Sequence, residues 1–193
     1  MPPDPIAQFQ LLFRRAQRAR IALPEAMALA TASSRGVPSV RWVLLKAADA
    51  RGFTFFTDGR SRKGRELRAN PRAALAFYWD PIRKQVRIDG RVEQVTPAEA
   101  DAYWLTRPRA SRLAALASLQ SEELASWPAL IARWRRLRRE YAGRDVPRPR
   151  AWTGFRVVPD TIEFWSRDAH RLHHRELFVR RRGGGWQRRL LQP

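Results

Sequence analysis

The first part of the chain has apolar residues three or four positions apart, which is the spacing of one face of a helix. The residues with this spacing are Ile6, Phe9, Leu12, Phe13 and Ala16. Asp4 followed by Pro5 suits a helix start, because aspartate is a good N-cap and proline is favoured in the first turn. The pattern therefore predicts an amphipathic helix over about 5 to 20.

After this helix the apolar runs become short, and turn residues such as Arg35-Gly36 and Asp58-Gly59 separate them. Strands are predicted at about 27 to 32, 40 to 46, 53 to 57, 73 to 79 and 84 to 95. Helical patterns follow at about 97 to 105, 110 to 118 and 122 to 141. Three more strands are predicted at about 154 to 165, 176 to 182 and 186 to 190, with Gly183-Gly184-Gly185 as a hairpin turn.

Short strands with short connections imply antiparallel pairing, and they favour a closed or nearly closed β-barrel decorated by helices over a parallel α/β sheet. The length of 193 residues suits a single domain, 1–193, with the N-terminal helix and a helical insertion at about 97 to 141. The chain has no GxGxxG motif and no P-loop. Any bound phosphate must therefore be held by side chains instead of a glycine-rich loop.

The net charge of +20 would by itself suggest a polyanionic partner such as nucleic acid. The only lysines are Lys46, Lys63 and Lys84, so the surplus is nearly all arginine, as expected from a coding composition that favours arginine codons. The sequence contains no zinc-finger spacing, no RNP-type motif and no basic helix leading into heptads. Nucleic-acid binding is therefore not the expected function.

The chain has no apolar run of the roughly 20 residues that a membrane span needs, and it opens without the pattern of a signal peptide. These features predict a soluble, cytoplasmic protein without a membrane partner. The chain has no cysteine, which excludes disulfides and thiolate chemistry. The three histidines lack an HExxH-type helix or a carboxylate pair, so no metal site is expected.

A dense group of functional side chains lies between 163 and 175, where two acids, two aromatics, three arginines and all three histidines occur. Arg171-Leu172-His173 alternates as a strand would, which would point the guanidinium and the imidazole to one face. Such a pair could hold an anionic ligand and still orient a proton. The alternative is a solvated basic edge strand, on which arginines merely discourage aggregation.

Two further sets of side chains could hold phosphate. The first comprises the strand from Arg41 to Lys46 and the turn from Thr57 to Lys63, where hydroxyl, guanidinium and ammonium groups converge. The second comprises Tyr103, Arg107 and Ser111, which are four apart and share one face if the helix continues through Pro108. A solvated basic turn and ordinary core or capping roles remain alternatives for these residues.

Taken together, these motifs resemble the pyridoxamine 5'-phosphate oxidases, which are flavoenzymes of vitamin B6 metabolism. The resemblance covers about Met27 to Pro193. The motifs that carry it are Arg41 to Lys46, Arg62-Lys63, Gln85-Val86, Arg107-Pro108-Arg109-Ala110-Ser111, Gln120-Ser121, Trp152 to Phe155, Glu163-Phe164-Trp165 and Arg171-Leu172-His173. Several separated motifs in the right order are more specific than any one of them.

The resemblance implies an FMN-binding split β-barrel, mainly antiparallel, that acts as a homodimer with shared active sites. The residues that it assigns to FMN are Arg41, Trp42, Val43, Leu44, Leu45, Lys46, Phe56, Thr57, Arg62, Lys63, Gln85, Gln120, Ser121, Trp165 and Arg175. The residues that it assigns to the substrate are Lys46, Tyr103, Arg107, Ser111, Arg171, Leu172 and His173. Arg171 and His173 would be catalytic and would come from the other subunit to cover the pyridine ring.

The implied reaction is oxidation of pyridoxamine or pyridoxine 5'-phosphate to pyridoxal 5'-phosphate with O2, which releases H2O2 and, from the amine, ammonia. A flavin supplies the redox step, so no nucleophile or metal is required. Phe56 stands where the family usually has tyrosine, and His174 replaces a small acidic or amide residue. Two alternatives are a split-barrel flavin oxidase for another aromatic substrate, of the phenazine type, and a non-catalytic flavin or pyridoxal phosphate binding protein.

Overall fold

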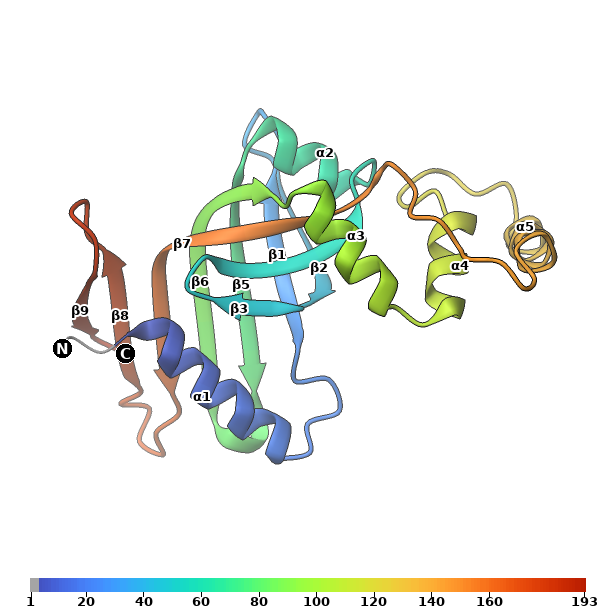
Figure 1. Ribbon diagram of the computed structural model, residues 1–193. Helices are drawn as coiled ribbons and strands as arrows, with labels where there is room; N and C mark the ends of the chain where they lie inside the picture. The colour runs from blue at the N-terminus through green and yellow to red at the C-terminus, as the bar shows by residue number, and fades with distance from the viewer. Residues whose placement is uncertain (1–3) are drawn as a thin grey trace.

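In the computed structural model, which describes residues 4–193, nine strands form one antiparallel sheet that curls into a barrel (Figure 1). The strands are β1 (Ala26–Ala32), β2 (Pro38–Leu44), β3 (Ala47–Asp49), β4 (Gly52–Asp58), β5 (Arg72–Trp79), β6 (Lys84–Gln94), β7 (Trp152–Ser166), β8 (His174–Arg180) and β9 (Trp186–Leu191). The helices are α1 (Pro5–Arg18), α2 (Arg62–Ala69), α3 (Pro97–Thr106), α4 (Arg109–Ala117), α5 (Trp127–Glu140) and the short 3-10 helix η1 (Asp80–Ile82).

The order of the strands explains why the barrel is split. The hydrogen-bonded path runs β2-β1-β5-β6-β7-β4-β3, and β8 and β9 extend from β7. Within residues 4–193 no strand pairing joins the ends of this path, β2 and β3. The long strand β7 pairs with β4 in its first half and with β8 in its second half. The predicted antiparallel split-barrel fold is confirmed.

Helix α1 covers one opening of the barrel with its apolar face. Its N-cap Asp4 accepts a hydrogen bond from the backbone N–H of Ile6. Phe9 is fully buried, and its ring centroid lies 4.8 Å from that of Phe53 and 5.1 Å from that of Phe77. Each such buried aromatic contributes about 1.5 to 3 kcal/mol of hydrophobic stabilisation. The main core is therefore built from both the strands and α1.

A second, smaller apolar cluster holds the helical insertion against the barrel. Its buried members are Trp104, Leu113, Val146 and Trp152. The indole N–H of Trp104 donates to the carbonyl of Val146 at 2.8 Å. In Figure 1, α4 and α5 lie at the end of the molecule opposite to β8, β9 and the start of α1. Within residues 4–193 no helix is long and apolar enough to cross a membrane.

The structure differs from the predicted elements at several places. The segment that looked like a basic turn continues into α2, which Ser61 caps by accepting from the N–H of Gly64. The short strand β3 was not predicted. The last insertion helix begins only at Trp127, because Ser126 is its N-cap and the residues from 118 to 126 form a loop.

Candidate active site

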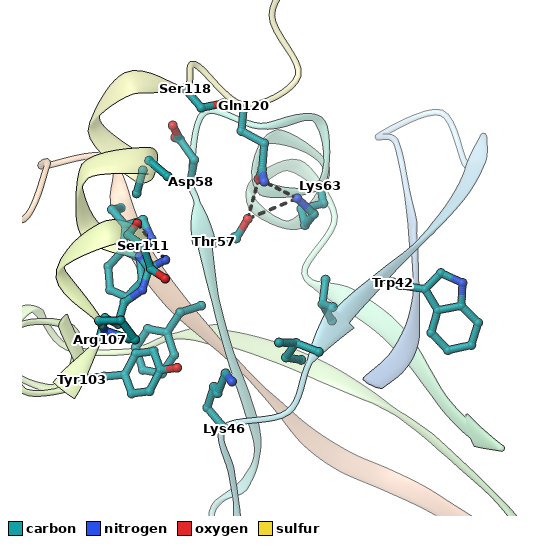
Figure 2. A pocket seen from close by; sticks show the side chains of 17 residues that line it. Trp42, Lys46, Thr57, Asp58, Lys63, Tyr103, Arg107, Ser111, Ser118 and Gln120 are labelled. Atoms are coloured by element: carbon teal, nitrogen blue, oxygen red, sulfur yellow. Dashed lines mark hydrogen bonds between the residues drawn. The ribbon is translucent and has the colours of Figure 1, made fainter. Parts of the chain in front are cut away.

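A cavity of about 560 Å³, called the first cavity below, lies between the strands β2 and β4 and the helices α2, α3 and α4 (Figure 2). The predicted site residues that line it are Trp42, Val43, Leu44, Lys46, Phe56, Thr57, Lys63, Tyr103, Arg107, Ser111 and Gln120. Asp58, Pro108, Ala114, Ala115, Ser118 and Trp152 also line it. The two predicted phosphate-holding sets thus meet at one cavity.

Lys63 places a buried ammonium group in the wall of the first cavity. Its Nζ donates to Gln120 Oε1 at 2.8 Å and to Thr57 Oγ1 at 3.2 Å, and both contacts are visible in Figure 2. No carboxylate within residues 4–193 forms an ion pair with it. Burial, and to a lesser extent the charge of Arg41, lowers the pKa of Lys63 to about 8. A buried cation whose hydrogen-bond partners are all neutral is suited to an anionic ligand.

Arg107 provides a second uncompensated cation in the same cavity. Its guanidinium lies over the ring of Trp152 at 4.8 Å and over that of Trp104 at 5.2 Å. One of its nitrogens donates to the carbonyl of Ser111 at 3.3 Å, whereas Nη1 is buried without a hydrogen-bond partner among the described residues. Burial lowers the pKa of Arg107 from its usual value. The two tryptophans thus position a charge whose remaining donors can bind an anion.

The break between α3 and α4 creates this arrangement. Tyr103 belongs to α3, Arg107 is the C-cap residue of that helix, and Ser111 belongs to α4. Pro108 begins the new helix as its N-cap, so the helix does not continue through this residue. The three residues therefore do not share one continuous helix face, yet all three line the first cavity.

Three aromatic rings form a stack in the first cavity. Phe56 lies 4.1 Å from Tyr103 and 5.3 Å from Trp152 between ring centroids, with interplanar angles of 17° and 9°. Phe56 has no hydroxyl, so its part in the stack is wholly apolar. The flat wall that results suits a planar ligand.

Arg41 and Arg62 are directed to a buried carboxylate and do not line the first cavity. Arg62 Nε donates to Glu66 Oε1 at 2.9 Å, and Arg41 Nη2 donates to Glu66 Oε2 at 3.3 Å. Ser39 and Thr31 also donate to Glu66. Burial alone would raise the pKa of Glu66, but these hydrogen bonds outweigh it and hold the pKa at about 2. Glu66 therefore fixes both arginines beside the cavity wall.

A second cavity, of about 300 Å³, is lined mainly by part of the group of side chains between 163 and 175 that the sequence had singled out. It is lined by Tyr78, Trp165, Arg167, Asp168, Ala169, Arg171 and His173. His173 lies against Trp165 with 4.6 Å between ring centroids. The backbone N–H of Asp168 donates to His173 Nδ1 at 3.2 Å. Nδ1 is therefore the acceptor nitrogen, and the proton of the neutral imidazole lies on Nε2.

The prediction of a strand through Arg171-Leu172-His173 is wrong. Strand β7 ends at Ser166 and β8 begins at His174, so the three residues lie in the connecting loop. Arg171 has a φ of 63°, which is the left-handed region and is incompatible with a strand. Arg171 and His173 still line one cavity because the loop folds back, whereas Leu172 is 73% exposed.

The remaining predicted residues occupy other positions. Gln85, Trp165 and Arg175 are aligned across β6, β7 and β8, and Arg175 makes two hydrogen bonds to Glu163, at 2.8 and 3.1 Å. Leu45 is buried in the main core. Ser121 lies in the loop between α4 and α5 with a φ of 73°. In one chain, therefore, some predicted site residues line one or the other of two cavities that share no residue, and the rest line neither.

Sequence reasoning missed Glu66, Trp152 and Tyr78 as contributors to these sites. The four-residue spacing of Arg62 and Glu66 on a helix was an available signal for the first of them. The roles of Trp152 and Tyr78 depend on contacts between segments that are far apart in the sequence. Within residues 4–193 no group of three or more histidine, cysteine or acidic side chains could hold a metal ion.

The chain matches two family descriptions. Residues 13–166 match "Pyridoxamine 5'-phosphate oxidase". Residues 152–193 match "Pyridoxine 5'-phosphate oxidase C-terminal dimerisation region". Together these matches span both cavities and nearly the whole barrel.

Curated relatives named pyridoxine/pyridoxamine 5'-phosphate oxidase are similar over nearly their full length. The chain is 54% identical to the pyridoxine/pyridoxamine 5'-phosphate oxidase of Myxococcus xanthus (strain DK1622), over 100% of this chain and 93% of the relative. It is 51% identical to the protein of that name from Anaeromyxobacter dehalogenans (strain 2CP-C), over 99% of this chain and 96% of the relative.

Two solved structures have the same fold. PhzG from Burkholderia lata 383, solved in complex with tetrahydrophenazine-1-carboxylic acid, has a TM-score of 0.95 and 36% identity, over 100% of this chain and 94% of that one. A pyridoxamine 5'-phosphate oxidase-related, FMN-binding protein from Nostoc punctiforme has a TM-score of 0.79 and 18% identity, over the whole of both chains, and shows the fold alone.

Proposed function

The chain belongs to the pyridoxamine 5'-phosphate oxidase family and is an oxidoreductase, and from this premise we propose that it uses FMN to oxidise pyridoxamine 5'-phosphate or pyridoxine 5'-phosphate to pyridoxal 5'-phosphate. Dioxygen accepts the two electrons and leaves as hydrogen peroxide. With the amine substrate, water is taken up and ammonia is released. The proposed location is the cytoplasm.

The observation that carries this proposal is that buried cations without a carboxylate partner among the described residues lie at two separate places in the first cavity, Lys63 at one and Arg107 at the other. Lys63 contacts only neutral oxygens, and Arg107 is held by two indole rings. A site that binds a single anion would not require two separate cations. A phosphorylated cofactor and a phosphorylated substrate would give each cation a partner.

The donor set around Lys63 fits the phosphate of FMN. Lys63, Thr57 and Gln120 would bind it, and Glu66 keeps Arg41 and Arg62 next to this position. Bound FMN would supply the redox chemistry by accepting a hydride from the substrate and passing its electrons to dioxygen. The row Gln85, Trp165 and Arg175 would contact the flavin from the partner subunit.

The second phosphate set would hold the substrate. Lys46, Tyr103, Arg107 and Ser111 would bind its phosphate, and Arg171, Leu172 and His173 of the other subunit would cover its pyridine ring. The contact from Asp168 keeps the proton of neutral His173 on Nε2, where it can donate to a polar atom of the substrate. These residues would therefore bind the substrate, orient its ring and exclude water from it.

We also propose that the protein is a homodimer with shared active sites. The two cavities of one chain are separate, and the C-terminal part of the chain matches a dimerisation region. The edge strand β2 exposes Val40, Trp42 and Leu44, with Trp42 68% exposed. An apolar stripe next to a cavity is expected to be covered by another protein surface.

The purified protein is expected to form pyridoxal 5'-phosphate from pyridoxamine 5'-phosphate only when dioxygen is present, with one hydrogen peroxide per product. Absorbance of the aldehyde product and a coupled peroxidase assay would measure both. Binding of FMN and pyridoxal 5'-phosphate without turnover would instead indicate the non-catalytic alternative.

A phenazine-type oxidase is the second candidate, because PhzG shares the fold at a TM-score of 0.95. The ligand named with that structure is a carboxylic acid without phosphate. The phosphate-holding set Lys46, Tyr103, Arg107 and Ser111 favours a phosphorylated substrate for this chain. Comparing kcat/KM for pyridoxamine 5'-phosphate and for a reduced phenazine carboxylic acid would decide between the two.

A further inference from the structure

Three of the residues proposed to contact the flavin belong to a single row that crosses the sheet. Gln85 on β6 is paired with Trp165 on β7, and Trp165 is paired with Arg175 on β8. Paired residues on neighbouring antiparallel strands point to the same face, with Cβ atoms about 4.5 to 5.5 Å apart. The row therefore presents an amide, an indole and a guanidinium side by side.

The row continues by one more residue, Tyr78 on β5, which is paired with Gln85. Its neighbours Phe77 and Trp79 are buried in the core, so alternation along the strand turns Tyr78 to the same outer face as Gln85 and Trp165. Tyr78 is 53% exposed, which is unusual for a large aromatic residue on a central strand. An aromatic residue in this position has apolar area available for a ligand.

The orientation of Tyr78 is fixed by polar contacts at its hydroxyl end. The phenol donates to Asp80 Oδ1 at 2.8 Å, and Arg167 lies 3.6 Å from the same carboxylate oxygen. This contact raises the pKa of Tyr78, so the phenol stays neutral near pH 7. Tyr78 and Trp165 line the same second cavity as Arg171 and His173. The hydroxyl is thus occupied, and the face of the ring remains for packing.

We propose that Tyr78 is the fourth member of this row and packs against the flavin ring of the shared site. This inference rests on the proposed function. Tyr78 acts there as a positioning residue: its ring extends the flat surface begun by Trp165, and Asp80 holds it in place. Tyr78 therefore strengthens binding of the flavin ring and has no contact with the cofactor phosphate.

The experiment compares FMN with riboflavin, which has the same ring without the phosphate. Tyr78→Ala is expected to weaken binding of both by a similar factor, about 10-fold, since stacking on an aromatic side chain is worth about 1 to 3 kcal/mol. Lys63→Met should weaken the binding of FMN but not the binding of riboflavin, which has no phosphate. Tyr78→Phe should bind both nearly as wild type. Titration of the apoprotein by flavin fluorescence, with visible circular dichroism of the bound flavin, measures these effects.

Tyr78→Leu keeps an apolar side chain on β5 and is expected to behave as Tyr78→Ala, which separates loss of the aromatic ring from damage to the strand. Trp127→Ala is the matched control, because Trp127 is 67% exposed at the start of α5, outside both cavities. A wild-type protein that binds no flavin would reject the proposed function itself. Wild-type flavin binding by Tyr78→Ala, or a change confined to the KM of the substrate, would overturn only the role of Tyr78.

Discussion

Lys63 and Arg107 show how a strongly basic chain can keep specific charges available for ligands. Most arginines near the barrel are paired, as Arg156 is with Glu99 at 2.6 Å. Lys63 is surrounded by hydroxyl and amide oxygens instead, and Arg107 by indole rings. Neutral partners hold a cation in place without cancelling its charge. At the proposed anion sites, therefore, Lys63 and Arg107 are held in place while their charges stay available.

The role of Arg107 can be tested by changing both the residue and the ligand. Arg107→Ala is expected to lower kcat/KM for pyridoxamine 5'-phosphate by roughly 10- to 100-fold, because a hydrogen bond to a charged group is worth about 1.5 to 3 kcal/mol. Most of the loss should appear in KM, since the phosphate contacts are the same in the ground and transition states. Steady-state kinetics on both substrate forms measure the effect.

Unphosphorylated pyridoxine provides the comparison for this variant. It should be a poor substrate for the wild type, and Arg107→Ala should lower its kcat/KM little further, because the partner of the guanidinium is already absent. Arg135→Ala, an exposed arginine on α5, is the control and should leave both substrates unchanged. Equal losses on the two substrates would instead show that Arg107 supports the fold.

At the scale of elements, Glu66 joins α2 to the strands β1 and β2. It accepts hydrogen bonds from Thr31 on β1, from Ser39 and Arg41 on β2, and from Arg62 on its own helix. Its pKa of about 2 lies below the usual 4.5, so the folded state binds the carboxylate form more favourably than the unfolded chain does. This stabilisation is complete above about pH 4.5 and is lost as the pH falls through about 2.

Glu66→Gln should therefore lower the free energy of unfolding near pH 6, and the difference from wild type should shrink as the pH falls from about 4.5 to about 2. Urea unfolding at a series of pH values measures this. Glu93→Gln, which removes a carboxylate from an exposed pair with Arg91, should change stability much less. If the loss in free energy of unfolding for Glu66→Gln does not depend on pH, the carboxylate charge is not what joins these elements.

The main strands and most helices could be predicted from the sequence because their periodicity is local. Helix α2 could not, since its eight residues Arg62–Ala69 contain few apolar positions and Gly64. That glycine is required by packing: a Cβ there would lie 2.3 Å from the carbonyl oxygen of Gly59. The loop through Arg171 was mistaken for a strand because alternation of residue types does not reveal a positive φ.

The site residues were predicted through the family resemblance, but their distribution over two cavities was not. Nothing in the sequence shows that Arg107 is held by Trp152, because this contact joins the end of α3 to the start of β7. The place of Tyr78 beside Gln85 likewise depends on the pairing of β5 with β6. Contacts between distant segments are set by the register of the sheet, which local patterns do not specify.

At the scale of the whole molecule, the separation of the two cavities has a direct consequence for assembly. In one chain, Arg107 lines the first cavity and Arg171 lines the second, and no residue lines both. In the proposed symmetric dimer, the first cavity of each chain would lie against the second cavity of its partner, which would create two equivalent sites. Each site then needs Arg107 from one chain and Arg171 from the other.

Hybrid dimers can test this arrangement. Arg107→Glu and Arg171→Glu should each inactivate the homodimer by placing a carboxylate where an anion binds or a cation is needed. Coexpression with two different affinity tags and sequential purification gives dimers with one chain of each variant. In a shared-site dimer one site carries both substitutions and the other carries neither, so about half of the wild-type activity per dimer should return.

A second hybrid distinguishes a shared site from a site built within one chain. A chain with both substitutions, paired with a wild-type chain, should be nearly inactive, because each of its two sites then contains one altered residue. If each site were instead built within one chain, the outcomes would be exchanged: the first hybrid would be inactive and the second would retain about half of the activity. The same two substitutions are present in both hybrids, so effects on folding or on flavin content cannot produce the difference. The distribution of activity between the hybrids therefore reports only which chain contributes each residue.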